Sequence, residues 1–338
     1  MPKVLVTGAT GFIASHVVLE LIERGYAVRG SARSADKADA LNAILSDYAG
    51  KPVEIELVNL DLNRDEGWAE AMNGVDFVQH IASPFPPTQP ESPDDLIIPA
   101  RDGALRALKA AEAAGIKRVV LTSSVAAVDN GWGKSGPDIY DETSWTTMTG
   151  PEPVPAYSQS KTIAEQAAWD YVKGEGEGLE LAVINPAAVL GPAMSEDVST
   201  SLSLVSTALG GTLPAFPPLA FGVVDVRDIA KAHVEAMLRP EAAGERFIMS
   251  AGELWFREVG DILREAYPDR KIPSSEMPVW LAKLFALFMP ALKPSAHRLG
   301  RLNRYSNQKA REQLGIEFRS PQDAVRASAE SLIKLGIF

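Results

Sequence analysis

The chain has 338 residues, of which 46% are hydrophobic and 23% charged, and this length predicts about two domains or one large α/β unit with an appendage. The apolar content excludes wholesale disorder. The 44 Asp and Glu outweigh the 33 Lys and Arg to give a net charge of −11, which argues against a nucleic-acid partner. The chain has no cysteine and its histidines lack the spacing of a zinc site, so we expect neither disulfides nor a metal.

The start of the chain lacks the basic and apolar regions of a secretory leader. The longest apolar stretch, residues 279–292, is shorter than the roughly 18 residues that a spanning helix needs, and Lys283 and Pro290 interrupt it. We therefore expect a cytoplasmic protein with no membrane partner.

Short β-branched runs alternate with longer amphipathic stretches through the first two-thirds of the chain. The runs predict strands at 3–7, 26–32, 53–60, 76–81, 118–121, 180–184 and 246–249. The amphipathic stretches predict helices at 11–24, 36–45, 65–72, 96–114, 156–173 and 226–238. Apolar strands that alternate with helices indicate an α/β fold, with a doubly wound parallel sheet (Rossmann fold) covered on both faces.

The texture changes after about residue 186, where prolines and polar residues become frequent. We expect residues 1–186 and 221–250 to form a dinucleotide-binding domain, and 187–220 and 251–338 a smaller, mostly helical substrate-binding lobe. The clearest helices of this lobe are predicted at 280–288, 307–314 and 322–335. The apolar side chains at 280–288 have helical spacing, which is typical of core packing.

A glycine turn joins the first strand to the first helix. Gly8 permits the tight turn, Gly11 lets the backbone approach a pyrophosphate, and Ala14 is small enough for the helix to pack on the strand. The N-terminus of a helix supplies unpaired N–H groups and a partial positive charge, which suits a phosphate. The turn therefore predicts a dinucleotide site.

The second strand indicates which dinucleotide is bound. An NAD site favours an acidic residue at the end of this strand, and none is present. Arg33 can instead stack on adenine and bind a 2′-phosphate, with Lys37 as a second cation. These residues favour NADP(H). Asp61 and Leu62, after the third strand, are placed to meet the adenine amino group.

A tyrosine and a lysine four residues apart share one face of the helix at 156–173. A phenol titrates near 10, and we expect the Lys161 ammonium to lower the pKa of Tyr157 by about two to three units. Ser124 follows the strand at 118–121, and ligands of open parallel sheets bind at the carboxyl ends of strands. Ser124 is therefore placed to polarise a carbonyl while Tyr157 transfers the proton.

The joint pattern resembles the extended branch of the short-chain dehydrogenase/reductase family, in particular its dihydroflavonol-reductase and NADPH-dependent aldehyde/ketone-reductase group. The motifs that carry the resemblance are TGATGFIA (7–14), RS (33–34), HIASP (80–84), LTSS (121–124), YSQSK (157–161), AEQAAW (164–169), NP (185–186) and VDVRDIAKAH (224–233). The resemblance implies a catalytic Ser124–Tyr157–Lys161 triad and NADPH-dependent reduction of a carbonyl. The predicted cofactor contacts, from the residues and the resemblance together, are Gly8, Thr10, Gly11, Phe12, Ile13, Arg33, Lys37, Asp61, Leu62, Ala82, Ser83, Ser123, Tyr157, Lys161, Pro186, Ala187 and Val189.

The function expected from these motifs is an NADPH-dependent carbonyl reductase acting on a small molecule with an aryl or hydrophobic substituent. Aromatic and apolar loop residues are predicted to line its substrate pocket: Phe85, Trp132, Trp145, Met194 and Phe216. Two alternatives stay open, a nucleotide-sugar epimerase or dehydratase of the same fold and a non-catalytic NADP-binding sensor. The sequence leaves open whether the protein is a monomer or a homodimer. His80 and His233 lie on apolar elements and are predicted to be structural.

Overall fold

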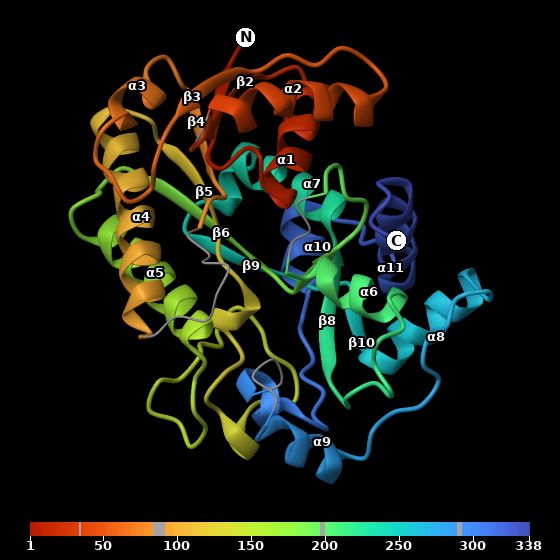
Figure 1. Cartoon of the computed structure of the whole chain (residues 1–338). Helices are drawn as coiled ribbons and strands as arrows, with labels where there is room; N and C mark the ends of the chain where they lie inside the picture. Colours follow the sequence, from red (N-terminus) through yellow and green to blue (C-terminus); the bar gives the residue numbers. More distant parts are fainter. Residues whose placement is uncertain (34, 84–91, 197–199, 289–292) are drawn as a thin grey trace.

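A computed structural model describes residues 1–338 except 34, 84–91, 197–199 and 289–292. The side chains of residues 35–39, 134 and 293–294 also lie outside the description. The described residues form two sheets with helices packed around them (Figure 1).

The main sheet has seven parallel strands in the order β3-β2-β1-β4-β5-β6-β9. Its strands are β1 Lys3–Val6, β2 Ala27–Ala32, β3 Glu56–Asn59, β4 Phe77–His80, β5 Arg118–Thr122, β6 Glu180–Pro186 and β9 Glu245–Met249. Side chains alternate between the two faces of a strand. In β1, Val4 and Val6 therefore enter the core on one face while Leu5 enters the core on the other.

Helices cover both faces of this sheet. They are α1 Phe12–Glu23, α2 Ala35–Ala49, α3 Trp68–Met72, α4 Asp94–Ala113, α5 Ala156–Lys173, α7 Val226–Leu238 and α10 Gln308–Leu314. Helices α4 and α5 pack side by side on one face, with α3 against α4, whereas α1 and α7 pack together on the other (Figure 1). This arrangement confirms the predicted doubly wound parallel sheet.

A second sheet of three strands, in the order β10-β8-β7, lies beside the main sheet. Strands β7 and β8 are parallel, and β10 is antiparallel to β8. Helices α6, α8 and α11 share an apolar core with this sheet. The bounds of the elements are β7 Ala188–Leu190, β8 Ala220–Asp225, β10 Gly252–Trp255, α6 Leu202–Leu209, α8 Phe256–Ala266, α9 Val279–Ala286 and α11 Pro321–Lys334, with 3-10 turns η1 Val125–Ala127, η2 Gly133–Ser135, η3 Pro240–Ala242 and η4 Lys293–Arg298.

The helical C-terminal region is confirmed, but the small sheet and helices α6 and α8 were not predicted. Within the segment 221–250 that the sequence assigns to the first domain, β9 joins the main sheet and α7 packs on α1, whereas β8 belongs to the small sheet. The boundaries of the two predicted domains stay a prediction.

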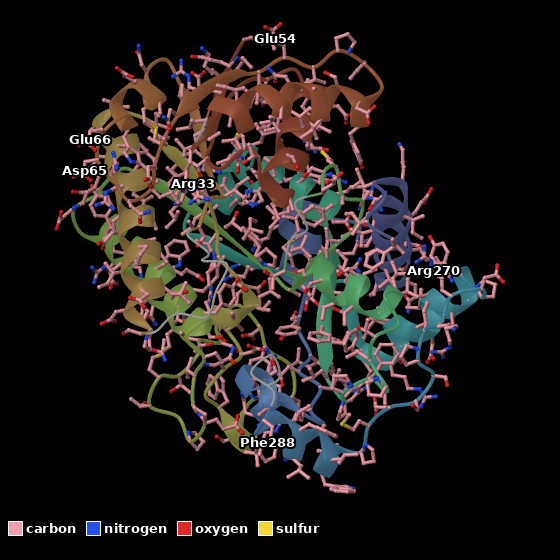
Figure 2. The ribbon with its side chains drawn as sticks, viewed as in Figure 1. Arg33, Glu54, Asp65, Glu66, Arg270 and Phe288 are labelled. Carbon is pink, nitrogen blue, oxygen red and sulfur yellow. The ribbon has the colours of Figure 1, made fainter. Side chains whose placement is uncertain are left out.

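Helix α9 exists as predicted, but the expectation that its apolar side chains form core was wrong. Only the small residues Ala282 and Ala286 are buried, against Leu219 and Leu299. The large side chains face outward, and Trp280 and Phe288 are 70% and 77% exposed. Figure 2 shows Phe288 at the lower edge of the molecule. Because every residue of α9 except Lys283 is apolar, the spacing alone does not show which face packs inward.

Candidate functional site

In the glycine turn between β1 and α1, the absence of a side chain lets the backbone come close to the neighbouring loop after β4. Gly8 has a φ of 64°, and a Cβ atom there would lie 2.8 Å from the Cβ atom of Ala82, so a larger residue would be strained. Gly11 is the N-cap of α1, where no side chain caps the helix and no acidic residue lies in the first turn. No side chain therefore occupies the first N–H groups at the positive end of α1. These N–H groups suit the binding of a diphosphate.

Thr7 fixes the loop after β4 beside this turn. Its buried hydroxyl accepts hydrogen bonds from the backbone N–H groups of Ile81 and Ala82, each at 3.1 Å, and lies 3.0 Å from His80 Nδ1. Since both lone pairs of the hydroxyl are used, its hydrogen is donated to His80. Burial lowers the pKa of His80 to about 3, so the ring is neutral and accepts this bond. The predicted cofactor residues Ala82 and Ser83 are therefore held at the carboxyl ends of β1 and β4.

The residues predicted to bind the adenosine end lie after β2 and β3. Arg33 follows β2 and its side chain is exposed (Figure 2). Lys37 belongs to α2, but its side chain lies outside the described residues. Asp61 accepts hydrogen bonds from the backbone and side-chain N–H groups of Asn63, and the Leu62 carbonyl accepts one from Arg106.

The three predicted catalytic residues come together at the carboxyl end of β5. Ser124 is the N-cap of η1, and its hydroxyl accepts from the backbone N–H of Ala126 at 3.1 Å and hydrogen-bonds with Tyr157. Tyr157 lies in the first turn of α5, and the Lys161 Nζ atom is 6.0 Å from the centre of its ring. Tyr157 keeps 36% of its surface exposed, whereas Lys161 keeps 9%.

The pKa values of the phenol and the ammonium differ from the expectation. Burial of the phenol oxygen raises the pKa of Tyr157 above 10, and the hydrogen bond with Ser124 opposes this shift. Burial also lowers the pKa of Lys161 to about 8, against the attraction of Glu165. The predicted lowering of the Tyr157 pKa by Lys161 is not seen, since the pKa is raised and only the hydrogen bond with Ser124 opposes the effect of burial.

Several predicted cofactor residues share one small cavity of about 20 Å³. Ala82, Ser83, Ser123 and Lys161 line it with His80, Ala100, Ala104, Leu121, Thr122, Ala164 and Glu165. Pro186 ends β6 and is buried, as are Ala187 and Val189 just after it. A second pocket of about 470 Å³ brings Thr10 and Phe12 together with Met194. Ile13 packs against the core beneath the turn.

The predicted substrate residues do not form one cluster. Phe85 lies outside the described residues. Trp132 lies against Tyr140, with ring centres 6.4 Å apart, and Trp145 stacks on the guanidinium of Arg246 at 3.8 Å. The placement of Phe216 corrects the expectation, because its side chain is fully buried.

Phe216 is a core residue of the C-terminal region. Its ring packs 4.9 Å from that of Phe256, and a Cβ atom on Gly260 would lie 2.3 Å from it. Met194 lines the 470 Å³ pocket with Thr10 and Phe12, and its contact with substrate stays a prediction.

With this geometry in place, comparison with known proteins decides the family. Residues 4–252 match the model of the "NAD dependent epimerase/dehydratase family". The chain belongs to this family.

Relatives that are named as reductases match this chain along nearly its whole length. The chain is 34% identical to cinnamoyl-CoA reductase 1 from Arabidopsis thaliana, over 98% of this chain and 90% of that protein. It is 33% identical to the NADPH-dependent methylglyoxal reductase GRE2 from Saccharomyces cerevisiae, over 98% of both chains. The crystal structure of yeast methylglyoxal/isovaleraldehyde reductase Gre2 complexed with NADPH superimposes with a TM-score of 0.81 at 32% identity, over 99% of both chains.

Three polar residues of this family member were missed by sequence reasoning. Glu165, Asn185 and Arg246 are buried and hydrogen-bonded to one another next to the triad. Glu165 lies four residues after Lys161 on the same helix face, which is a signal that spacing alone provides. The pairing with Arg246 joins residues 81 positions apart and has no such signal.

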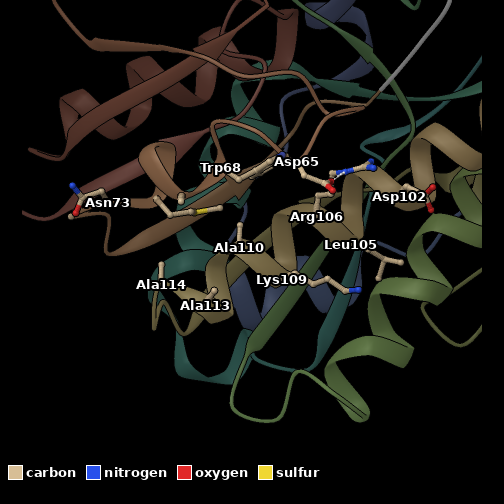
Figure 3. A pocket seen from close by; sticks show the side chains of 13 residues that line it. Asp65, Trp68, Asn73, Asp102, Leu105, Arg106, Lys109, Ala110, Ala113 and Ala114 are labelled. Atoms are coloured by element: carbon tan, nitrogen blue, oxygen red, sulfur yellow. Dashed lines mark hydrogen bonds and ion pairs between the residues drawn. The ribbon is translucent and has the colours of Figure 1, made fainter.

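Another hollow of this family member lies away from the site. It measures about 840 Å³ and runs between α3 and α4, where Trp68, Leu105, Arg106 and Lys109 are among its lining residues (Figure 3). None of the predicted site residues lines it. In the described ranges, no group of three or more acidic or histidine side chains gathers to hold a metal ion. No helix in those ranges is long and apolar enough to cross a bilayer.

Proposed function

We propose that this protein is an NADPH-dependent carbonyl reductase that converts an aldehyde or ketone into an alcohol. The observation that carries the proposal is the Ser124–Tyr157 hydrogen bond, with Lys161 on the next turn of the same helix. The relatives named above share the reductase activity in their names. An epimerase or dehydratase that keeps a tightly bound NAD favours an acid after β2, where this chain has the exposed Arg33.

The residues present fit NADPH. The glycine turn at Gly8 and Gly11 would hold the diphosphate at the uncapped N-terminus of α1. Arg33 would hold the 2′-phosphate, and Lys161 the nicotinamide ribose. When bound, NADPH supplies a hydride from its nicotinamide ring to the carbonyl carbon.

The side chains of the triad divide the remaining work. The Ser124 hydroxyl binds and polarises the carbonyl oxygen of the substrate. The backbone N–H of Ala126, which donates a hydrogen bond to this hydroxyl, fixes the position of the hydroxyl. Tyr157 donates its proton to that oxygen as the alcohol forms. Its raised pKa keeps the phenol protonated at neutral pH, which is the form that reduction requires.

The substrate class is proposed on the aromatic side chains near the site. Trp132 follows η1 in the loop after Ser124, which suits an aryl or hydrophobic substituent on a small molecule. A panel of aryl ketones, α-ketoesters and aldehydes, each followed by NADPH consumption, would identify the preferred group. A cytoplasmic location stays a prediction of the sequence.

The substitution Tyr157→Phe tests the reaction. We expect turnover to fall by about two to four orders of magnitude while NADPH still binds, because only the proton donor is removed. Tyr171→Phe is the matched control, since Tyr171 lies at the other end of α5 and bonds to Glu112. Unchanged turnover in Tyr157→Phe would overturn the proposal.

A further inference from the structure

A carboxylate and a guanidinium are buried together directly behind the triad. Glu165 on α5 and Arg246 on β9 are 1% and 6% exposed. Arg246 Nη2 donates a hydrogen bond to Glu165 Oε2 at 3.1 Å, and Arg246 Nε lies 2.8 Å from Oε1 in an ion pair without hydrogen-bond geometry. Trp145 stacks on the other side of the guanidinium. Arg246 therefore fixes both the position and the orientation of the Glu165 carboxylate.

The same carboxylate binds the ends of two further strands. Its Oε2 atom accepts from Ser123 Oγ at 2.6 Å and from Asn185 Nδ2 at 2.7 Å. Asn185 Nδ2 also lies 3.3 Å from the Ser124 carbonyl. Glu165 thus connects α5 to the carboxyl ends of β5 and β6 and, through Arg246, to the start of β9. Ser123 is the neighbour of the triad serine.

Stability alone does not account for such a pair. Removing two charges from water is unfavourable, and replacement of a buried ion pair by apolar residues is often neutral or stabilising. The site places this pair one helical turn from Lys161, and both Lys161 and Glu165 line the 20 Å³ cavity. A carboxylate at this position acts on the lysine through its charge.

We propose that Glu165, oriented by Arg246, is a positioning residue that keeps Lys161 in its ammonium form and holds the Ser123–Ser124 segment against α5. The proposal rests on the carbonyl-reductase function proposed above. In this proposal Arg246, on the edge strand β9, acts through Glu165 on the triad at the carboxyl end of β5.

The charged and titratable groups around Lys161 agree with this role. Burial lowers the pKa of Lys161 to about 8, and the Glu165 carboxylate works against that shift. His80 faces Lys161 from β4 but is neutral, since burial lowers its pKa to about 3. Tyr157 faces it from the preceding turn of α5, and Arg246 faces Glu165 from β9. Without the carboxylate, Lys161 would lose its proton at lower pH.

The test is the pH profile of kcat for wild type, Glu165→Gln and Glu165→Asp. Activity that needs the ammonium is lost as pH rises through the pKa of Lys161. In Glu165→Gln we expect this loss at a pH about one unit lower, with relative activity about five-fold lower at pH 8 and nearly unchanged at pH 6. Glu165→Asp keeps the charge, so we expect its profile to follow wild type although its kcat falls.

The matched control is Glu180→Gln. Glu180 forms an ion pair at 2.7 Å with the buried Arg118, at the amino ends of β5 and β6 and away from the triad. We expect the substitution of Glu180 to leave the pH profile unchanged. If Glu165→Gln does not fold, Glu165→Gln/Arg246→Gln removes both charges, and we expect a shift in the same direction but smaller, because the repulsion between Arg246 and Lys161 is lost as well. Thermal melting and NADPH titration show that each variant is folded.

The outcomes separate the two proposals. A wild-type enzyme that reduces no carbonyl compound with NADPH would overturn the proposed function itself. An active wild type whose profile is shared by the folded Gln variant would overturn the role of Glu165 alone. Equal shifts in the Gln and Asp variants would also overturn it, because the charge would then not be the cause.

Discussion

The hydroxyl of Thr7 offers a sharp test of how the cofactor loop is held. We expect Thr7→Val, which keeps the shape and removes the hydroxyl, to destabilise the protein strongly. The change leaves the N–H groups of Ile81 and Ala82 and the His80 ring nitrogen without their partner. A buried polar group that loses its partner costs about 1–3 kcal/mol. Because residues 81 and 82 are partly exposed, the lower value of about 1 kcal/mol applies to each, and the buried His80 ring adds about 1 kcal/mol or more, so the sum is at least about 3 kcal/mol.

Thr122→Val is the matched control on β5. The Thr122 hydroxyl is also buried and bonds to one partner, His233 Nε2, at 3.0 Å. One lost bond predicts a destabilisation of about 1 kcal/mol. Equilibrium unfolding in urea should therefore separate the two variants by about 2 kcal/mol, with equal m-values.

The same substitution should weaken NADPH binding, because Thr7 holds Ala82 beside Gly8. We expect the Kd of Thr7→Val for NADPH, measured by fluorescence titration, to rise about tenfold, which is about 1.4 kcal/mol. Equal destabilisation in the two threonine variants, together with an unchanged Kd, would show that the hydroxyl does not hold the loop.

Three further predictions concern the cofactor, acid stability and the surface. Arg33→Asp should raise the KM for NADPH far more than that for NADH, and equal effects on both would argue against a 2′-phosphate contact. Burial lowers the pKa values of His16, His80 and His233 to about 4, 3 and 3, so these rings are neutral in the folded protein. The unfolded chain takes up protons on them as pH falls below 6.5, and the folded protein therefore loses stability. At pH 5 each is expected to cost about 2 kcal/mol, visible as a falling urea midpoint, and a flat midpoint from pH 7 to 5 would contradict this. Phe288→Ser should change the free energy of unfolding by less than about 0.5 kcal/mol, since the side chain is 77% exposed, and a loss above 1 kcal/mol would show that it packs.

Local signals made much of the main sheet and of its covering helices predictable. Helices α5 and α7 occur at the predicted bounds because their apolar periodicity is regular and their ends carry clear signals. The glycine turn was found because Gly8 and Gly11 lie in a strand–turn–helix context. The order of the motifs along the chain then placed Ser124 after β5 and placed Tyr157 and Lys161 one turn apart on α5.

The parts that were missed depend on burial and on distant contacts. Sequence shows that Lys161 neighbours Tyr157, but the direction of the Tyr157 pKa shift depends on desolvation, which only the fold determines. Phe216 has the composition of a pocket residue, yet it packs in the core because Gly260 leaves room for its ring. The Glu165–Arg246 pair joins α5 to β9, and no local pattern predicts it.

Asp129, in the loop that leads from the triad serine to Trp132, shows how late this region is completed. The carboxylate is buried, and its Oδ2 atom accepts hydrogen bonds from Arg298, Asn303 and Tyr305, which follow it by 169, 174 and 176 residues. During synthesis on the ribosome the Asp129 carboxylate therefore lacks these partners until at least 169 further residues have been translated. All seven strands of the main sheet precede these partners in the chain, so the loop after the triad serine is fixed in place later than the sheet.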